Sequence, residues 1–182
     1  MKSRERLTRR HLLLIGASLT RGGLPLRAGA NVSPDGARAI AFHNLHTGEN
    51  LKATYRVGGE YVPSVLKDID HILRDFRTGE VAAIDTRLLD LLHLLQSRLE
   101  SDEPFHVISG YRSPETNSKL AQQSSGVAKK SLHMKGMAID VRLPGRALTD
   151  LRRAAVSLKL GGVGYYPKAN FIHADVGRVR YW

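Results

Sequence analysis

The stretch SLHMKGMAIDVR, residues 131–142, combines a histidine with a short apolar strand that ends in charged residues. His133 stands seven residues ahead of Asp140, with a glycine between them. Because side chains alternate along a strand, Asp140 lies on the face opposite to Ile139 and Val141. We therefore expect the apolar face to pack on helices and Asp140 to point to the other side of a sheet.

A second stretch, FIHADVG at residues 171–177, has the same form. Alternation places Ile172 and Ala174 on one face of this strand and His173 and Asp175 on the other. Two strands thus each present a polar cluster that the packing of an apolar core does not require.

Outside these stretches, the chain shows helical and strand periodicities without an internal repeat or a long linker. Apolar spacing and capping residues predict helices over residues 63–77, from Asp85 to about Leu99, from Ser113-Pro114 onward and over about 147–158. Short strand patterns occur within residues 39–57 as a hairpin around Thr47–Asn50, and at 106–110, 137–142, 163–165, 171–176 and 178–182. We therefore predict an α+β fold, with helices packed on a small, mostly antiparallel sheet.

The positive charge of the chain is concentrated at its N-terminus. The sequence has 28 Lys+Arg and 17 Asp+Glu, a net charge of +11. Residues 1–30 hold seven basic residues and one acidic residue, so only +5 belongs to residues 31–182. That remainder does not call for a nucleic-acid partner, and it suits work on an anionic cell wall.

Residues 1–30 also have the layout of an export signal: a basic start, an apolar run at 12–19 and small residues before a cleavage site expected after Ala30. The pair Arg9-Arg10 resembles the twin-arginine signal. A basic amphipathic helix or a nucleic-acid arm explains the charge but not this order. We therefore expect export to the periplasm and a single domain over residues 31–182.

The composition excludes several classes of protein. With 42% hydrophobic and 25% charged residues, the chain is typical of globular proteins. It lacks the roughly 18 to 20 consecutive apolar residues of a membrane helix. The sequence contains no cysteine, so thiol nucleophiles, cysteine zinc sites and iron–sulfur clusters are excluded. Any metal must therefore be held by His, Asp or Glu.

His133, Asp140 and His173 form a set of residue types that commonly holds zinc. Two imidazoles and a carboxylate leave the fourth tetrahedral position open to water, which the metal activates for hydrolysis. The alternatives are a surface His133, a capping Asp140 and a strand-edge His173 hydrogen-bonded to Asp175. Spacing alone favours these alternatives.

Three groups of motifs, in this order, carry a resemblance to a known family: SGYRS at 109–113, residues 131–140, and residues 162–177. They resemble the LAS-type zinc peptidases, which are related to D-alanyl-D-alanine carboxypeptidases and dipeptidases. Within that group the chain resembles the murein endopeptidase K family from about Leu45 to Trp182. The resemblance implies a LAS/hedgehog-like metallopeptidase fold, one Zn²⁺ per chain and peptidoglycan as the partner.

The resemblance also implies roles for individual residues. His133, Asp140 and His173 match the zinc ligands. Arg112 matches the arginine that orients the scissile carbonyl and stabilises the oxyanion, a task suited to a fixed cation. Ser131 is a candidate for hydrogen bonding to substrate.

One position departs from the pattern of many relatives. They carry a Glu or Asp as general base three residues before the last histidine, where this chain has Asn170, and an amide cannot accept that proton. Some relatives carry a second histidine where this chain has Phe171. Asp175 is our candidate for the base, because it shares a strand face with His173. It could equally be a carboxylate that orients His173, and both interpretations stay open.

These observations lead to the hypothesis of an exported zinc endopeptidase that acts in cell wall growth or remodelling. It would hydrolyse peptide cross-links of peptidoglycan that join two diaminopimelate residues, and D-alanyl-diaminopimelate links as a further substrate. The alternatives are a non-catalytic peptidoglycan-binding or metal-binding periplasmic module and a D,D- or L,D-carboxypeptidase. The sequence does not indicate an oligomeric state.

Overall fold

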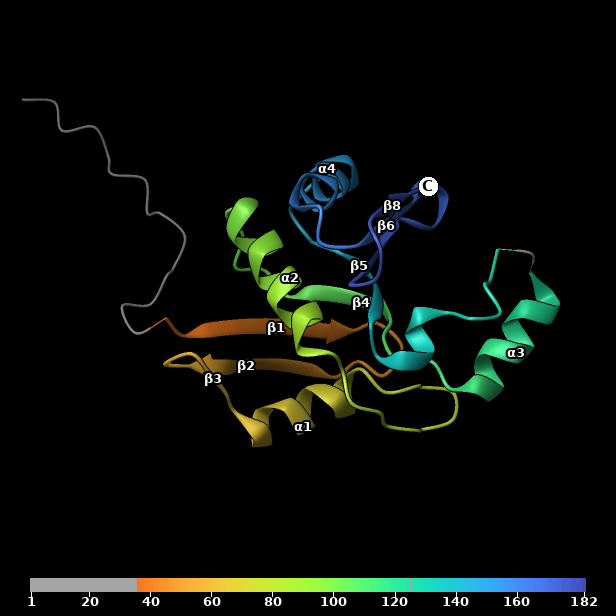
Figure 1. Cartoon of the computed structure of the whole chain (residues 1–182), viewed down its shortest axis with the longest axis horizontal. Coiled ribbons are helices and arrows are strands. Elements are labelled where there is room, and N and C mark those ends of the chain that lie inside the picture. Colours follow the sequence, from red (N-terminus) through yellow and green to blue (C-terminus); the bar gives the residue numbers. More distant parts are fainter. Residues whose placement is uncertain (1–35, 125) are drawn as a thin grey trace, which may run out of the picture.

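The computed structural model describes residues 36–124 and 126–182, so the expected export signal lies outside the described residues. An eight-stranded sheet with the order β3-β2-β1-β4-β5-β7-β6-β8 forms its centre (Figure 1). The strands are β1 (Arg38–Asn44), β2 (Asn50–Val57), β3 (Glu60–Tyr61), β4 (Phe105–Ser109), β5 (Ala138–Arg142), β6 (Gly162–Tyr166), β7 (Phe171–Asp175) and β8 (Arg180–Tyr181).

Antiparallel neighbours dominate the sheet. The pairs β1–β4 and β6–β8 are parallel, and the other five pairs are antiparallel. The helices are α1 (Pro63–Ile72), α2 (Thr86–Arg98), α3 (Pro114–Gln123) and α4 (Leu148–Leu158), with short 3₁₀ helices η1 (Leu132–Lys135) and η2 (Pro167–Ala169). The predicted α+β fold with a mostly antiparallel sheet is therefore confirmed.

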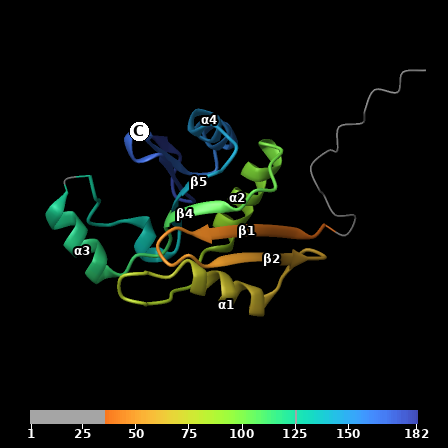
Figure 2. The same cartoon turned by 180° about the vertical axis from the view of Figure 1, so that it is seen from behind.

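The helices α1, α2 and α4 cover one face of the sheet, whereas α3 stands apart from it (Figure 1). In Figure 1 α2 lies in front of β1 and β4, and in Figure 2, seen from behind, these strands lie in front of α2. Ile139 and Val141 of β5 are fully buried in the same core as residues of α1, α2 and α4. The alternation of β5 therefore places its apolar face on the helices, as predicted, and leaves Asp140 on the opposite face.

The predicted caps are present at two helices. The carboxylate of Asp85 accepts the backbone N–H of Arg87 at the start of α2, at 3.0 Å. Ser113 Oγ accepts the backbone N–H of Thr116 at the start of α3, at 3.2 Å. Within residues 36–124 and 126–182, no helix has both the length and the apolar character needed to cross a membrane.

The first helix is shorter than the periodicity predicts, because α1 ends at Ile72 rather than near Arg77. The carbonyl of Leu73 accepts the backbone N–H of Tyr111 at 2.7 Å, and the buried carboxylate of Asp75 accepts the backbone N–H of Ser113 at 2.9 Å. Contacts from a distant loop thus replace the last helical turn. They hold the segment 109–113 in place beside the site described next.

Candidate metal centre

Three buried side chains from two strands and a 3₁₀ helix converge on the face of the sheet opposite the helices. Asp140 of β5 stands directly opposite His173 of β7 in the antiparallel pair. His133 belongs to η1, which ends at Gly136 in the left-handed conformation, with φ 64°, so that the chain turns directly into β5. The sheet register and this turn bring the three predicted ligands together.

The spacing of the three facing atoms suits a tetrahedral metal. His133 Nε2 lies 3.2 Å from His173 Nδ1 and 3.3 Å from Asp140 Oδ1, and the latter two atoms are 2.9 Å apart. Ligands about 2.0–2.1 Å from zinc stand about 3.3 Å from one another at the corners of a tetrahedron. The donor set and its spacing therefore fit a zinc ion.

Hydrogen bonds at the far side of each imidazole set which nitrogen is free. His133 Nδ1 lies 2.7 Å from the carbonyl of Gly110, which can only accept, so Nδ1 carries the proton. His173 Nε2 lies 2.9 Å from Asp175 Oδ2 and donates to it. Each ring therefore donates from its outer nitrogen and directs its other nitrogen toward Asp140, where it is available to a metal, the arrangement that outer partners impose on metal-binding histidines.

Both carboxylates of this centre favour the ionised form. Burial opposes ionisation of Asp140, but His133 and His173 outweigh it and lower the pKa of Asp140. Burial also opposes ionisation of Asp175, but hydrogen bonds from His173 and Arg180 and from backbone N–H groups lower its pKa. The centre therefore offers negative charge to a cation at neutral pH.

Asp175 lies behind the centre rather than in the cleft. Its side chain is 0% exposed, and its two oxygens accept from His173, from the guanidinium of Arg180 at 2.7 and 3.1 Å, and from the backbone N–H groups of Gly162 and Gly177. It faces Nε2 of His173, the nitrogen on the side away from Asp140. This placement suits a carboxylate that orients His173.

The SGYRS segment delivers Arg112 to the centre. The backbone N–H of Arg112 donates to the carbonyl of His133 at 3.2 Å, and its guanidinium Nη2 lies 3.7 Å from Asp140 Oδ2 and 3.3 Å from Ser109 Oγ. Its Nε is buried without a hydrogen-bond partner among the described residues. Burial lowers the pKa of Arg112, although a guanidinium remains charged in proteins. The guanidinium of Arg112 therefore lies beside the candidate metal site and keeps N–H donors that no described protein group uses.

A cleft of about 300 Å³ opens over the centre. Ser131 lines it, and its hydroxyl accepts the backbone N–H of His133 at 3.3 Å, which caps η1. Asn170 does not line this cleft; it ends η2 in the left-handed conformation, with φ 54°, and faces a separate hollow. The position where relatives carry the base is therefore directed away from the cleft, whereas its neighbour Phe171 does line it.

Among the cleft residues that sequence reasoning missed are Tyr166, Arg180 and Trp182. The Trp182 ring lies 5.3 Å from the His173 ring, and Trp182 Nε1 donates to the Tyr166 hydroxyl at 2.8 Å. Alternate glycines in β6 make room for them, since a Cβ at Gly164 would lie 2.7 Å from the Trp182 ring. The three glycines of GGVGYY, residues 161–166, were the available signal that other side chains lie close over this strand.

Comparison with known proteins identifies the family to which this chain is similar. The sequence model of the family described as peptidoglycan L,D-endopeptidase MepK matches residues 32–182. The chain belongs to this family. The peptidoglycan L,D-endopeptidase MepK of Escherichia coli K12 is 44% identical over 174 residues, 96% of each chain. A probable peptidoglycan L,D-endopeptidase MepK of Haemophilus influenzae is 42% identical over 96% of this chain and 94% of its own length.

Membership confirms the resemblance to the murein endopeptidase K family. It makes the chain an enzyme of the metallopeptidase class. The three converging side chains supply the candidate metal site that this class requires.

Proposed function

We propose that the protein is a zinc-dependent endopeptidase that hydrolyses amide bonds in the peptide cross-links of peptidoglycan. The observation that carries this proposal is the triangle of His133, Asp140 and His173 atoms at 2.9 to 3.3 Å beside the guanidinium of Arg112. Family membership supports the same reaction class. A non-catalytic binding module would have no need for an oxyanion-binding cation next to a complete ligand set.

His133 Nε2, Asp140 Oδ1 and His173 Nδ1 would hold one Zn²⁺ per chain. When bound, zinc supplies Lewis-acid chemistry, which polarises a carbonyl and makes water a better nucleophile. In the overall reaction the C–N bond of the cross-link breaks, and water provides the oxygen of the new carboxyl group and a proton for the released amine. The free donors of Arg112 would stabilise the negative oxygen that develops on the carbonyl.

We assign Asp175 to positioning rather than to proton transfer. A general base needs hydrogen-bond reach to the proton that it removes. Asp175 is fully buried, and its oxygens are already used by His173, Arg180 and two backbone N–H groups. Its hydrogen bond to His173 instead holds the imidazole in the orientation that a metal needs.

The charge of the cleft supports an anionic substrate. Arg112, Lys130 and Arg180 line it, and Asp140 supplies the one carboxylate among its described lining residues. Peptide cross-links that contain diaminopimelate carry free carboxylates, so we propose the diaminopimelate–diaminopimelate link as the main substrate and the D-alanyl-diaminopimelate link as a further one. Ser131 lies at the cleft, where it can contact substrate.

We further propose that residues 1–30 are a twin-arginine export signal and that residues 31–182 work in the periplasm on the cell wall. The ordered basic, apolar and small-residue segments support this proposal, and the family match begins at residue 32. Replacing Arg9-Arg10 by Lys-Lys is expected to leave the protein in the cytoplasmic fraction. Unchanged periplasmic levels would argue against a twin-arginine route.

The decisive experiment digests purified cross-linked muropeptide dimers with the exported protein in the presence of zinc. We expect new monomers, which a chelator and the His133→Ala variant both abolish. No monomers in zinc-replete buffer would contradict the enzyme proposal. Release of a terminal amino acid from monomeric stem peptides, with dimers left intact, would point to a carboxypeptidase instead.

A further inference from the structure

A second hollow of about 260 Å³ lies beside the cleft, at the end of β5. His106 of β4, Arg142 of β5 and Asn170 after η2 contribute polar side chains to it. Asn170 directly precedes Phe171, which lines the cleft over the metal centre. The hollow and the cleft therefore adjoin each other along β7.

Three polar side chains of this hollow, those of His106, Arg142 and Asn170, have no hydrogen-bond partner among the described residues. His106 Nδ1 is buried without a hydrogen bond. Within residues 36–124 and 126–182, no hydrogen bond or ion pair engages the guanidinium of Arg142 or the side-chain amide of Asn170. A buried polar atom without a hydrogen bond and a half-buried charge without a counter-charge are costly, so His106 Nδ1 and Arg142 indicate that a polar ligand completes the site, and the exposed amide of Asn170 adds a donor at its rim.

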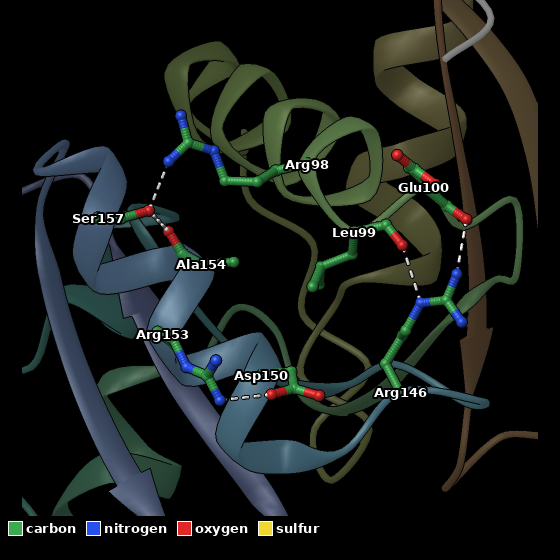
Figure 3. Close-up of a pocket in the computed structure, with 8 residues that line it drawn as sticks. All are labelled: Arg98, Leu99, Glu100, Arg146, Asp150, Arg153, Ala154 and Ser157. Carbon is green, nitrogen blue, oxygen red and sulfur yellow. Dashed lines mark hydrogen bonds and ion pairs between the residues drawn. The ribbon is translucent and has the colours of Figure 1, made fainter. Parts of the chain in front are cut away.

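The larger hollow in Figure 3, about 520 Å³ between the end of α2 and α4, shows the contrast. Its arginines are already engaged: Arg98 donates to Ser157, Arg153 pairs with Asp150, and Arg146 donates to carbonyls at the end of α2. Its polar groups are consequently satisfied within the protein. The hollow at Arg142 differs because Arg142, unlike Arg146 which also lines it, has no hydrogen bond or ion pair among the described residues.

Charge indicates the chemistry of the missing ligand. Arg142 and Arg146 line the hollow at the end of β5, and no Asp or Glu is among its described lining residues. A guanidinium offers a planar fork of donors that matches a carboxylate in a bidentate geometry. A carboxylate is therefore the group that this hollow suits.

The position of Arg142 relates the hollow to the reaction. Arg142 stands two residues after Asp140 on the same face of β5, which corresponds to about 6.6 Å along a strand. An extended peptide advances about 3.3 Å per residue, so the carboxylate would lie about two residues from the carbonyl at the metal centre. That distance places it on one arm of a cross-link whose scissile amide lies in the cleft.

We propose that the hollow formed by His106, Arg142 and Asn170 is a subsite for a carboxylate on one arm of the cross-linked substrate. The proposal rests on the function proposed above and extends it. An endopeptidase must hold peptide on both sides of the scissile amide, whereas a carboxypeptidase holds an extended peptide on one side only. The cleft and the adjoining hollow together provide two sides.

The test compares a cross-linked muropeptide dimer with a truncated substrate that keeps the scissile amide but lacks the carboxylate-bearing arm. Arg142→Gln should raise KM for the dimer about tenfold or more, the scale of losing hydrogen bonds to a charged group, with kcat changed less than twofold. The truncated substrate should be cleaved as by the parent protein. The control Arg153→Gln removes an exposed arginine of α4 that is paired with Asp150, and it should leave both substrates unaffected. An unchanged KM for the dimer, or equal losses on both substrates, would overturn the subsite.

Asn170→Gly provides a second variant that keeps the backbone able to adopt φ 54° while it removes the amide. It should also raise KM for the dimer, and it decides the question if circular dichroism shows that Arg142→Gln does not fold. Equilibrium binding of the dimer to metal-free protein separates this proposal from the enzyme function. Weaker binding by the variants, in a protein that cleaves no dimer, would preserve the subsite and reject the endopeptidase. Parent-like binding by both variants would reject the subsite.

Discussion

At the scale of single residues, Asp175 contacts the outer nitrogen of the proposed metal ligand His173. Its carboxylate lies between His173 and Arg180, so the ring of His173 is held from behind while its Nδ1 faces Asp140. Removing a partner of this kind from a metal-binding histidine typically weakens metal binding 10- to 100-fold. Metal affinity falls because the imidazole is no longer held in the required orientation and becomes less basic.

The variant Asp175→Asn tests this role. We expect its zinc affinity, measured by competition with a chelating indicator, to fall about 10- to 100-fold, with much of the turnover restored at saturating zinc. Asp150→Asn, which alters an exposed carboxylate of α4, should bind zinc normally. Normal zinc affinity combined with lost turnover would instead identify Asp175 as the base.

Gly164 shows a second effect at the scale of one residue. A Cβ at this position would lie 2.7 to 2.8 Å from atoms of the Trp182 indole, so the ring would have to leave its place beside His173. Because Trp182 is 48% exposed and its ring can move aside, we expect Gly164→Ala to lower the free energy of unfolding by about 1 kcal/mol, the low end of the cost of overpacking. Urea unfolding measures this loss. Gly126→Ala, where a Cβ meets only ordinary van der Waals contact, is the control, and equal stability of the two variants would contradict the packing argument.

At the scale of elements, Asp90 of α2 ties the helix to the β1–β3 edge of the sheet. Its carboxylate accepts the hydroxyls of Tyr55 and Tyr61, each at 2.9 Å, and pairs with Arg38 at 2.7 Å. Burial opposes ionisation of Asp90, but these partners outweigh it and lower its pKa. The folded protein therefore holds this proton less tightly than the unfolded chain does.

This shift predicts a pH dependence of stability. Because the pKa of Asp90 is lower in the folded state, its contribution is complete above the unfolded value of about 3.9 and disappears as pH falls through the folded value. In urea unfolding, the stability advantage of the parent protein over Asp90→Asn should be constant near neutral pH and should shrink below about pH 4. A difference that does not change with pH would show that Asp90 acts through packing alone.

Local sequence patterns predict most elements, and their failures have tertiary causes. Asp85 and Ser113 mark helix starts correctly, because a cap depends only on its own first turn. The end of α1 is mispredicted, because contacts from the segment 109–113 redirect the chain at Leu73. The parallel pairing of β8 with β6 is likewise absent from local periodicity, which explains why Arg180 and Trp182 were missed.

For the whole molecule, the sequence predicts the candidate ligands but not their geometry. Spacing alone favours ordinary structural roles for His133, Asp140 and His173. They were identified as candidate ligands because three motifs in the same order resemble those of a zinc peptidase family. The convergence itself depends on the β5–β7 register and on the turn at Gly136, which no local pattern encodes. Asn170 illustrates the same limit, since its direction away from the cleft follows from a left-handed backbone at the end of η2.

Because the three proposed ligands come together only in the folded protein, a metal bound to them would stabilise the folded state. The three facing atoms come from residues 133, 140 and 173, so an unfolded chain does not present them together. A ligand that binds only the folded state stabilises it by about 2.7 kcal/mol at a hundredfold excess over its Kd. For a domain of this size, that energy raises Tm by roughly 5–10 °C.

We therefore expect calorimetry to show this increase when zinc is added to metal-free protein, and a chelator to reverse it. His173→Ala should lose the increase while Asp150→Asn keeps it, because only the former removes a nitrogen from the triangle. An equal increase in His173→Ala would place the stabilising zinc elsewhere on the molecule.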